Sequence, residues 1–125
     1  MQGLHLTADL RGCPTDRALF TDTATLRQLC LRAVQGCGLS AVGELFHRFE
    51  HGGGVTGVVL LAESHLAVHT WPELGAVTVD VYVCNFSGDN SARAEKLLAD
   101  LQAAFEPATA EHHRLHRGAA DGAAA

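Results

Sequence analysis

A serine that directly follows a carboxylate, with two histidines close behind, is the feature of this chain that could do chemistry. The segment runs from Glu63 through Ser64 and His65 to His69. A serine hydroxyl is a weak nucleophile unless a neighbour takes its proton or its target carbonyl is strained or polarised. The hydroxyl of Ser64 has a target within reach, the carbonyl of Glu63. Attack there converts the peptide bond into an ester, so the segment indicates a self-cleavage site.

The products of such a cleavage define a class of reaction. Loss of the α-proton of Ser64 and elimination of the ester free a chain that ends at Glu63 and leave a dehydroalanine, which hydrolyses to a pyruvoyl group. The two fragments are residues 1–63 and 64–125. A pyruvoyl ketone forms a Schiff base with a primary amine and withdraws electrons as carbon dioxide leaves, as pyridoxal phosphate does elsewhere. The segment therefore predicts a covalent pyruvoyl cofactor derived from Ser64 and a decarboxylase.

A proton donor is needed once carbon dioxide has left, and Cys84 fits that role. It closes an apolar run, residues 77–83, that follows the serine segment. A thiol is largely protonated at neutral pH and can still deliver its proton. The alternative is a cysteine buried only for packing, because small thiols often serve as core residues.

The residues alone do not choose between the two histidines as the base. His69 is five positions after Ser64. An odd interval places two side chains on opposite faces of a flat strand, so we expect a bend or bulge between them. Judged from the residues alone, His65 is therefore an equal candidate for the base. Together with Cys84 these histidines offer three donors to a metal ion, but the helix that would align them is not indicated, and no metal site is expected.

The elements that carry these residues follow from hydrophobic periodicity. Alternating apolar residues predict strands, and apolar residues at helical spacing predict two amphipathic helices. Asp22 or Thr23 is the expected N-cap of the first helix and Ser91 that of the second. The strands are expected at residues 3–10, 39–49, 55–62, 64–70 and 76–83, with a short edge strand at 108–116, and the helices at about 23–36 and 91–106.

These elements predict an α+β fold in which a mostly antiparallel sheet carries both helices on one face, a two-layer sandwich. A length of 125 residues and 47% hydrophobic residues suit a single domain, expected over residues 1–118. Residues 119–125 contain no large apolar side chain and are expected to form a disordered tail.

Composition excludes several functions. The net charge of -5 comes without a basic run, so nucleic acid is not an expected partner. No apolar stretch approaches the length of a membrane span, and the N-terminus lacks the pattern of a signal peptide, which predicts a cytoplasmic protein. The four cysteines are expected to be free thiols in that compartment. Three histidines near the C-terminus are interpreted as solvated edge residues: His112, His113 and His116.

Several blocks resemble, in order, those of the bacterial S-adenosylmethionine decarboxylase proenzymes, the short prokaryotic class of pyruvoyl-dependent enzymes. The resemblance extends over nearly the whole chain up to about residue 118. The blocks are Gly3–Leu6, similar to the family's N-terminal strand, Phe46–Phe49 (FH[RK]F), Gly54–Val59 (GVSGVV), Glu63–His65 (ESH) and His69–Glu73 (HTWPE).

This resemblance implies a role for several residues around the cleavage site. Ser64 would become the pyruvoyl group after cleavage of the Glu63–Ser64 bond. His69 would drive the processing, which decides the choice between the two histidines. Thr56, at the family's serine position, would assist processing by hydrogen bonding, and Cys84 would be the proton donor.

The resemblance also implies a substrate, S-adenosylmethionine, whose decarboxylation supplies spermidine biosynthesis. Phe49 would stack on the adenine. Glu73 would approach the ribose or the amino acid end, and Asp9 stands where an acidic residue usually lies near the active site. The family further implies a homodimer of processed protomers whose active sites are completed across the interface, so that Phe49 and Ser64 of one site come from different protomers.

Two other functions remain open on the sequence. Some members of this family decarboxylate L-ornithine or L-arginine instead, and this chain departs from the family pattern at Thr56, at residues 74–76 and at Asn85. An unprocessed relative acting as a non-catalytic dimerising or regulatory module is the second alternative, and an intact purified chain would favour it.

Overall fold

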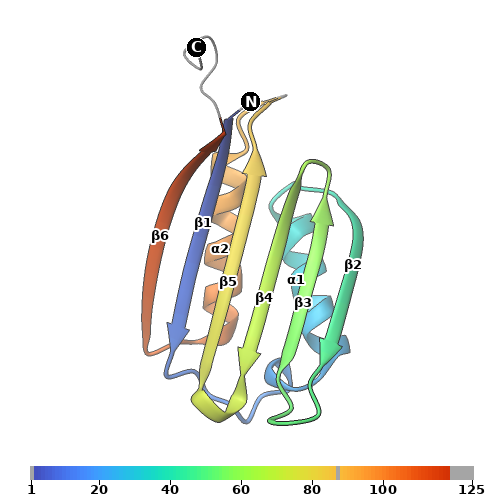
Figure 1. Ribbon diagram of the computed structural model, residues 1–125, viewed down its shortest axis with the longest axis vertical. Coiled ribbons are helices and arrows are strands. Elements are labelled where there is room, and N and C mark those ends of the chain that lie inside the picture. The colour runs from blue at the N-terminus through green and yellow to red at the C-terminus, as the bar shows by residue number, and fades with distance from the viewer. Residues whose placement is uncertain (1, 87, 119–125) are drawn as a thin grey trace.

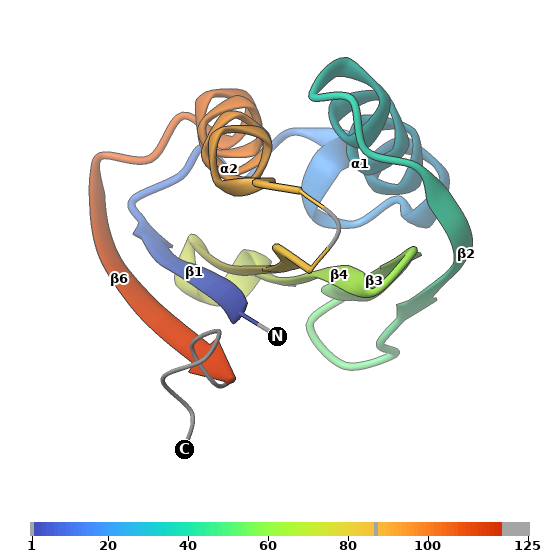
Figure 2. The ribbon, with the colours of Figure 1, turned by 90° about the horizontal axis from the view of Figure 1, so that it is seen from above.

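Six antiparallel strands form one sheet, and both α-helices lie against the same face of it (Figures 1 and 2). The computed structural model describes residues 2–86 and 88–118. The sheet order is β2-β3-β4-β5-β1-β6. The elements are β1 (Gln2–Arg11), the 3-10 turn η1 (Ala18–Phe20), α1 (Thr23–Gly36), β2 (Ala41–Arg48), β3 (Val55–Leu61), β4 (Ser64–Trp71), the 3-10 turn η2 (Pro72–Leu74), β5 (Ala76–Cys84), α2 (Ser91–Phe105) and β6 (Thr109–Gly118).

This arrangement confirms the predicted α+β fold with two helices on one face of an antiparallel sheet. The expected strands and helices all form, and most boundaries agree within two residues. The edge strand β6 is longer than predicted, because it pairs with β1 from Gln2↔Gly118 to Arg11↔Thr109. The predicted disordered tail, residues 119–125, lies outside the described residues. No helix among the described residues is long and apolar enough to cross a membrane.

Strand alternation divides the sheet into a helix face, which packs on α1 and α2, and an open face. In β5 every second residue from Val77 to Val83 is buried in the core, and the residues between them are partly exposed. α1 contributes Leu26, Cys30, Ala33 and Val34, which recur at helical spacing and fill the same core. The core therefore lies between the sheet and the helices, and no helix of residues 2–86 and 88–118 covers the open face (Figure 2).

The start of α2 differs from the prediction. Asn90, not Ser91, is the N-cap residue, and Ser91 is the first residue of the helix. Ser91 is held there because its backbone N–H donates to the Asp89 carboxylate at 2.9 Å. The expectation that Ser91 caps α2 is therefore wrong by one position, and the side chain that accepts the Ser91 N–H belongs to Asp89, two residues earlier.

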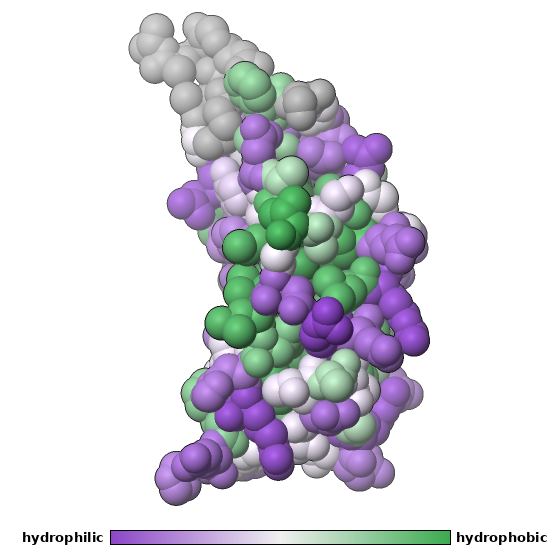
Figure 3. Space-filling view, turned by 90° about the vertical axis from the view of Figure 1, so that its right-hand side faces the viewer, coloured by the Kyte–Doolittle hydropathy of each residue, from purple (hydrophilic) through white to green (hydrophobic). Residues whose placement is uncertain are grey.

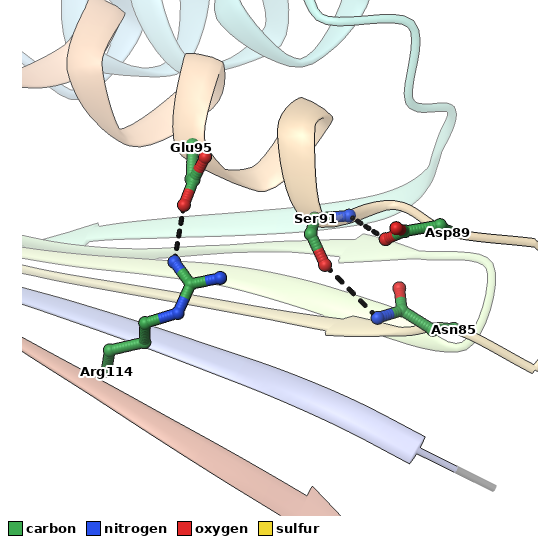
Figure 4. Close-up of polar contacts among 5 residues, drawn as sticks. All are labelled: Asn85, Asp89, Ser91, Glu95 and Arg114. Carbon is green, nitrogen blue, oxygen red and sulfur yellow. Dashed lines mark hydrogen bonds and ion pairs between the residues drawn. The ribbon is translucent and has the colours of Figure 1, made fainter.

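The exposed strand β6 is tied to α2 by polar side chains. His112 Nε2 lies 2.6 Å from the Gln102 side-chain oxygen, and Arg114 donates to Glu95 (Figure 4). All ten residues of β6 are exposed, which confirms the interpretation of its three histidines as solvated edge residues.

Burial of Cys30 predicts a pH dependence of stability. Burial raises the pKa of the Cys30 thiol from its ordinary 9.0 to about 12. The unfolded chain therefore ionises this thiol at lower pH than the folded chain. Below pH 9 the thiol leaves the free energy of unfolding unchanged, and as the pH rises from 9 toward 12 that free energy falls. Between pH 8 and pH 10.5 the free energy of unfolding should fall by about 2 kcal/mol more in the wild type than in Cys30→Ala. Urea unfolding of both proteins at both pH values measures this, and equal falls would contradict it.

Candidate active site

Ser64 is the first residue of β4 and directly follows the two-residue connection from β3. Leu61, the last residue of β3, pairs with Ser64 across that connection. The residue before the serine, Glu63, has a φ of 79°, in the left-handed region that favours glycine. A non-glycine residue held in a sparsely populated backbone region costs about 1–3 kcal/mol. The peptide bond that would be cleaved therefore follows a strained residue, fixed by pairing on both sides.

Cys84 lies beside Ser64. The sheet order places β5 next to β4, and their antiparallel pairing brings the end of β5 to the start of β4. The backbone N–H of Cys84 donates to Ser64 Oγ at 3.2 Å. Both residues line a pocket of about 200 Å³ at this end of the sheet, together with Gly38, Leu39, Ser40, Leu61, Ala62, Glu63 and Asn90. The structure thus brings together the predicted nucleophile and the predicted proton donor, which we call the serine half-site.

His69 does not belong to this half-site within the same chain. β4 pairs with β5 in continuous register from His65↔Tyr82 to Trp71↔Ala76. The expected bend or bulge is absent from this strand, so that expectation is wrong. Ser64 and His69 therefore lie on opposite faces of the sheet and about 17 Å apart along the strand.

His69 has its own partners on the open face. Thr56 is its cross-strand neighbour on β3, and the Thr56 hydroxyl lies 3.1 Å from His69 Nδ1. The His69 ring also stacks on Trp71, with centroids 5.7 Å apart. These contacts fix the ring and leave Nε2 as the nitrogen for proton transfer. Thr56, which is predicted to assist processing by hydrogen bonding, thus contacts the histidine that is predicted to drive it.

Phe49 and Glu73 meet at the same end of the sheet as His69. They line a cavity of about 300 Å³ with Glu50, His51, Gly54, Thr70 and Trp71. Phe49 is 48% exposed, and its ring makes an edge contact with His47, so it is not a core residue. We call Thr56, His69, Phe49, Trp71 and Glu73 the histidine half-site.

Asp9 lies in the cross-strand row of His69. Its register partner on β5 is Thr78, which in turn pairs with His69. Two strand spacings separate Asp9 from His69, about 10 Å. Asp9 therefore lies near the histidine half-site rather than beside Ser64.

His65, the other candidate base, is held by aromatic contacts on the open face. Its ring stacks on Tyr82 at 5.6 Å, and Tyr82 makes an edge contact with His5. A Cβ at Gly3 would lie 2.4 Å from the Tyr82 hydroxyl, so only glycine leaves room for this phenol. His65 and His69 share a face but stand four residues apart, about 13 Å, which is too far to bind one metal ion.

Sequence reasoning missed Asn90, whose side chain donates to the Cys84 carbonyl at 2.9 Å. An asparagine just before a helix is read as a cap. Only the position of β5 beside the start of α2 reveals that the Asn90 amide bonds the Cys84 carbonyl instead.

Comparison with solved structures identifies the class of protein. The crystal structure of the adenosylmethionine decarboxylase from Aquifex aeolicus matches with a TM-score of 0.85 and 34% sequence identity, covering 96% of this chain and 93% of that one. The chain has the fold of an enzyme of the decarboxylase class.

Sequence comparison gives the family. A sequence model described as S-adenosylmethionine decarboxylase matches residues 4–118. An S-adenosylmethionine decarboxylase proenzyme from Archaeoglobus fulgidus is 36% identical over 116 residues, 93% of this chain and 97% of the relative. One from Symbiobacterium thermophilum is 38% identical over 99 residues, which are 79% of this chain and 73% of that relative. The chain belongs to the S-adenosylmethionine decarboxylase family.

The left-handed conformation of Glu63 gives a testable prediction. Replacing Glu63 by glycine removes the backbone strain, partly offset by the greater chain entropy of unfolded glycine. In a Ser64→Ala background, which removes the nucleophile, we expect Glu63→Gly to raise the free energy of unfolding by about 1 kcal/mol. Chemical denaturation measures the change. Lower stability of the glycine variant would show that Glu63 is not strained.

Proposed function

We propose that this chain cleaves itself between Glu63 and Ser64 and, with the pyruvoyl group so formed, converts S-adenosylmethionine to its decarboxylated form and CO₂. The product is the aminopropyl donor for spermidine biosynthesis. The observation that carries this proposal is the contact between Ser64 and the Cys84 backbone, immediately after a strained residue, in a chain of this family. Decarboxylation of ornithine or arginine is not favoured, because the relatives reported above are named for S-adenosylmethionine.

The residues around Ser64 fit a pyruvoyl group. Cys84 is among the residues that line the pocket beside it, and this pocket lies next to the strand start that the group would cap. When present, the group supplies a ketone that binds the substrate's primary amine and accepts electrons as CO₂ departs. Cys84 then delivers the proton that replaces the lost carboxylate.

Self-cleavage uses only groups of this protein and water. Ser64 Oγ attacks the Glu63 carbonyl carbon, the peptide C–N bond breaks, and a proton moves from the hydroxyl to the freed amine. A base then takes the Cα proton of Ser64, and the Cβ–Oγ bond breaks with the electron pair on Oγ. Water replaces the amine nitrogen of the remaining dehydroalanine, and ammonia leaves. His69, held by Thr56, is the base that assists these proton transfers.

The cavity of the histidine half-site suits the nucleoside end of the substrate. Phe49 and Trp71 are both among its lining residues, and an exposed aromatic ring offers an apolar surface on which adenine stacks. Glu73 supplies a carboxylate that can accept hydrogen bonds from ribose hydroxyls. Two aromatic walls favour a nucleoside over the alkyl chain of ornithine or arginine.

The two half-sites are joined in a homodimer. Within one protomer they lie at opposite ends of β4, so the site is incomplete without a second copy (Figure 1). A twofold axis between two sheets stacked by their open faces, and perpendicular to the strands, places the β3–β4 end of one sheet over the histidine half-site of the other, and Ser64, as the first residue of β4, would reach that interface around the end of its strand. In this arrangement Ser64 and Cys84 act with His69 and Phe49 of the partner subunit.

The open face has the apolar surface that such stacking needs. Leu45, Leu60 and Leu115 project from it and are 71%, 50% and 49% exposed. Figure 3 looks onto the β2 side, and hydrophobic surface lies along the middle of its left-hand margin, where the open face lies, with hydrophilic surface above and below. Leu45 and Leu60 lie on β2 and β3 and Leu115 on β6 at the other edge, so a stacked second sheet would cover apolar side chains at both edges of this face. The unpaired thiols further suit a cytoplasmic location, which we include in the proposal.

Intact mass spectrometry of the purified wild type and Ser64→Ala tests the cleavage. We expect two wild-type fragments, 1–63 and 64–125, the second carrying a ketone in place of its amine. Ser64→Ala should remain one chain. An uncut wild type would favour the non-catalytic dimerising module. Release of CO₂ from S-adenosylmethionine, ornithine and arginine then compares the substrates, and faster release from either amino acid would replace the proposed one.

Mixing two inactive chains tests the shared site. His69→Ala supplies an intact Ser64, and Ser64→Ala supplies an intact His69, so only a heterodimer contains one complete processing site. We expect the His69→Ala chain to stay uncut alone and to be cleaved when both are co-expressed, as mass spectrometry of the separated chains would show. Equal processing of the His69→Ala chain with and without its partner would exclude the crossed arrangement.

A further inference from the structure

The peptide groups on both sides of Cys84 are held by hydrogen bonds. In the preceding peptide group, the Cys84 N–H donates to Ser64 Oγ at 3.2 Å. In the following one, the Asn85 N–H donates to the Gln2 carbonyl at 2.7 Å, and the Cys84 carbonyl accepts from Asn90 Nδ2 at 2.9 Å. These bonds fix the backbone at the end of β5, which sets the direction of the N–H aimed at the serine.

Asn90 makes this contact instead of capping its helix. At an N-cap, an asparagine side chain ordinarily accepts a hydrogen bond from a backbone N–H of the first turn. Asn90 occupies the N-cap of α2 and makes no such bond. Asp89 accepts the Ser91 N–H instead (Figure 4), and hydrogen bonds from the Ser91 backbone and hydroxyl lower the pKa of Asp89. Natural sequences depart from local rules mainly at functional positions.

The Asn90 amide is locked in this orientation. Its oxygen accepts from the Arg93 guanidinium at 2.8 Å, which leaves the nitrogen to face Cys84. The Asn90 backbone N–H donates to the Asn85 side chain at 2.8 Å, and Asn85 in turn donates to the Ser91 hydroxyl at 3.3 Å (Figure 4). Asn90 also lines the pocket that contains Ser64. The network therefore connects the start of α2 to the serine through one side-chain amide.

We propose that Asn90 is a positioning residue for self-cleavage, which keeps the backbone N–H of Cys84 on Ser64 Oγ while the chain is cut. This inference rests on the proposed function. The backbone amide of Cys84 would hydrogen-bond Ser64 Oγ, a task separate from proton donation by the Cys84 thiol. Asn90 would hold that amide in place, which an ordinary helix cap does not do.

The chemistry of elimination requires such a donor. As the Cβ–Oγ bond breaks, its electron pair passes to Oγ, which departs as one oxygen of the new Glu63 carboxylate, while the Cα proton goes to the base. Negative charge thus develops on Oγ. A donor already directed at the atom where charge develops stabilises the transition state without reorganisation. Asn90 contributes by holding this donor in place rather than by touching the reacting atoms.

The decisive variant is Asn90→Asp, which has almost the same shape and is an equally good N-cap but cannot donate to the Cys84 carbonyl. We expect its chain cleavage to be about tenfold slower than that of the wild type, with an unchanged Tm. Cleavage is followed by gel electrophoresis after pulsed cell-free synthesis of the full chain. Asn90→Ser, which also caps helices and has a shorter side chain, should be slowed similarly and carries the test if Asn90→Asp fails to fold.

A matched control separates positioning from helix stability. Asp89→Ala removes the bond to the Ser91 N–H and leaves Asn90 and Cys84 unchanged, so we expect a lower Tm with the wild-type rate of cleavage. Equal slowing of Asp89→Ala and Asn90→Asp would overturn the inference, as would cleavage of Asn90→Asp at the wild-type rate while the proposed function stands. A wild-type chain that stays uncut would overturn the proposed function and the inference together.

Discussion

The uninterrupted pairing of β4 with both of its neighbours is the constraint on which the rest of the structure depends. Because β4 has no bulge, its side chains alternate strictly, and Ser64 and His69 lie on opposite faces. The ladder that buries Leu66 and Val68 in the core therefore also separates the two groups between which the proposed cleavage moves protons. Sliding the strand by one residue would bring them no closer and would turn the buried side chains toward solvent. The protomer cannot meet the demands of its core and of a complete site at once, which is why the proposed site spans two protomers.

Strain at Glu63 supplies only part of what cleavage needs. A left-handed non-glycine residue stores about 1–3 kcal/mol, which is worth about five- to 150-fold in rate if all of it is released at the transition state. Splitting a peptide bond by a neighbouring hydroxyl requires far larger acceleration than this. A positioned hydrogen-bond donor or base contributes at least as much as the strain. The Cys84 N–H is one such group, and His69 of the proposed partner subunit is another, so the turn is better described as one of several aids than as the driving force.

The sequence predicts most of the fold because its strands alternate cleanly and its helices carry apolar residues at helical spacing. Two of its candidate residues, Ser64 and Cys84, begin one strand and end the next, and the hydrogen bond from the Cys84 N–H to Ser64 Oγ shows that these strand ends meet. The errors share a physical cause. The expected bulge in β4 follows from the odd interval between Ser64 and His69, whereas the continuous ladder is decided by core packing. The cap of α2 was misplaced because Asn90 and Ser91 are both good caps, and the choice depends on the Cys84 carbonyl, which only the tertiary fold brings to Asn90.

The open face explains why a second sheet is a suitable cover for this chain. Its leucines favour burial, but the same face also carries His5 bonded to Asp80 at 3.1 Å, besides the Thr56–His69 pair. Burying polar groups is costly unless they keep hydrogen-bond partners, and these pairs bring their partners with them. In the proposed dimer the apolar side chains supply most of the attraction, while the His5–Asp80 and Thr56–His69 hydrogen bonds are kept as water is excluded. Excluding water also strengthens the hydrogen bond from Cys84 to Ser64 Oγ, because electrostatic interactions gain strength in a less polar environment. Association would then not only complete the set of catalytic groups but also raise the effect of those already present in each protomer.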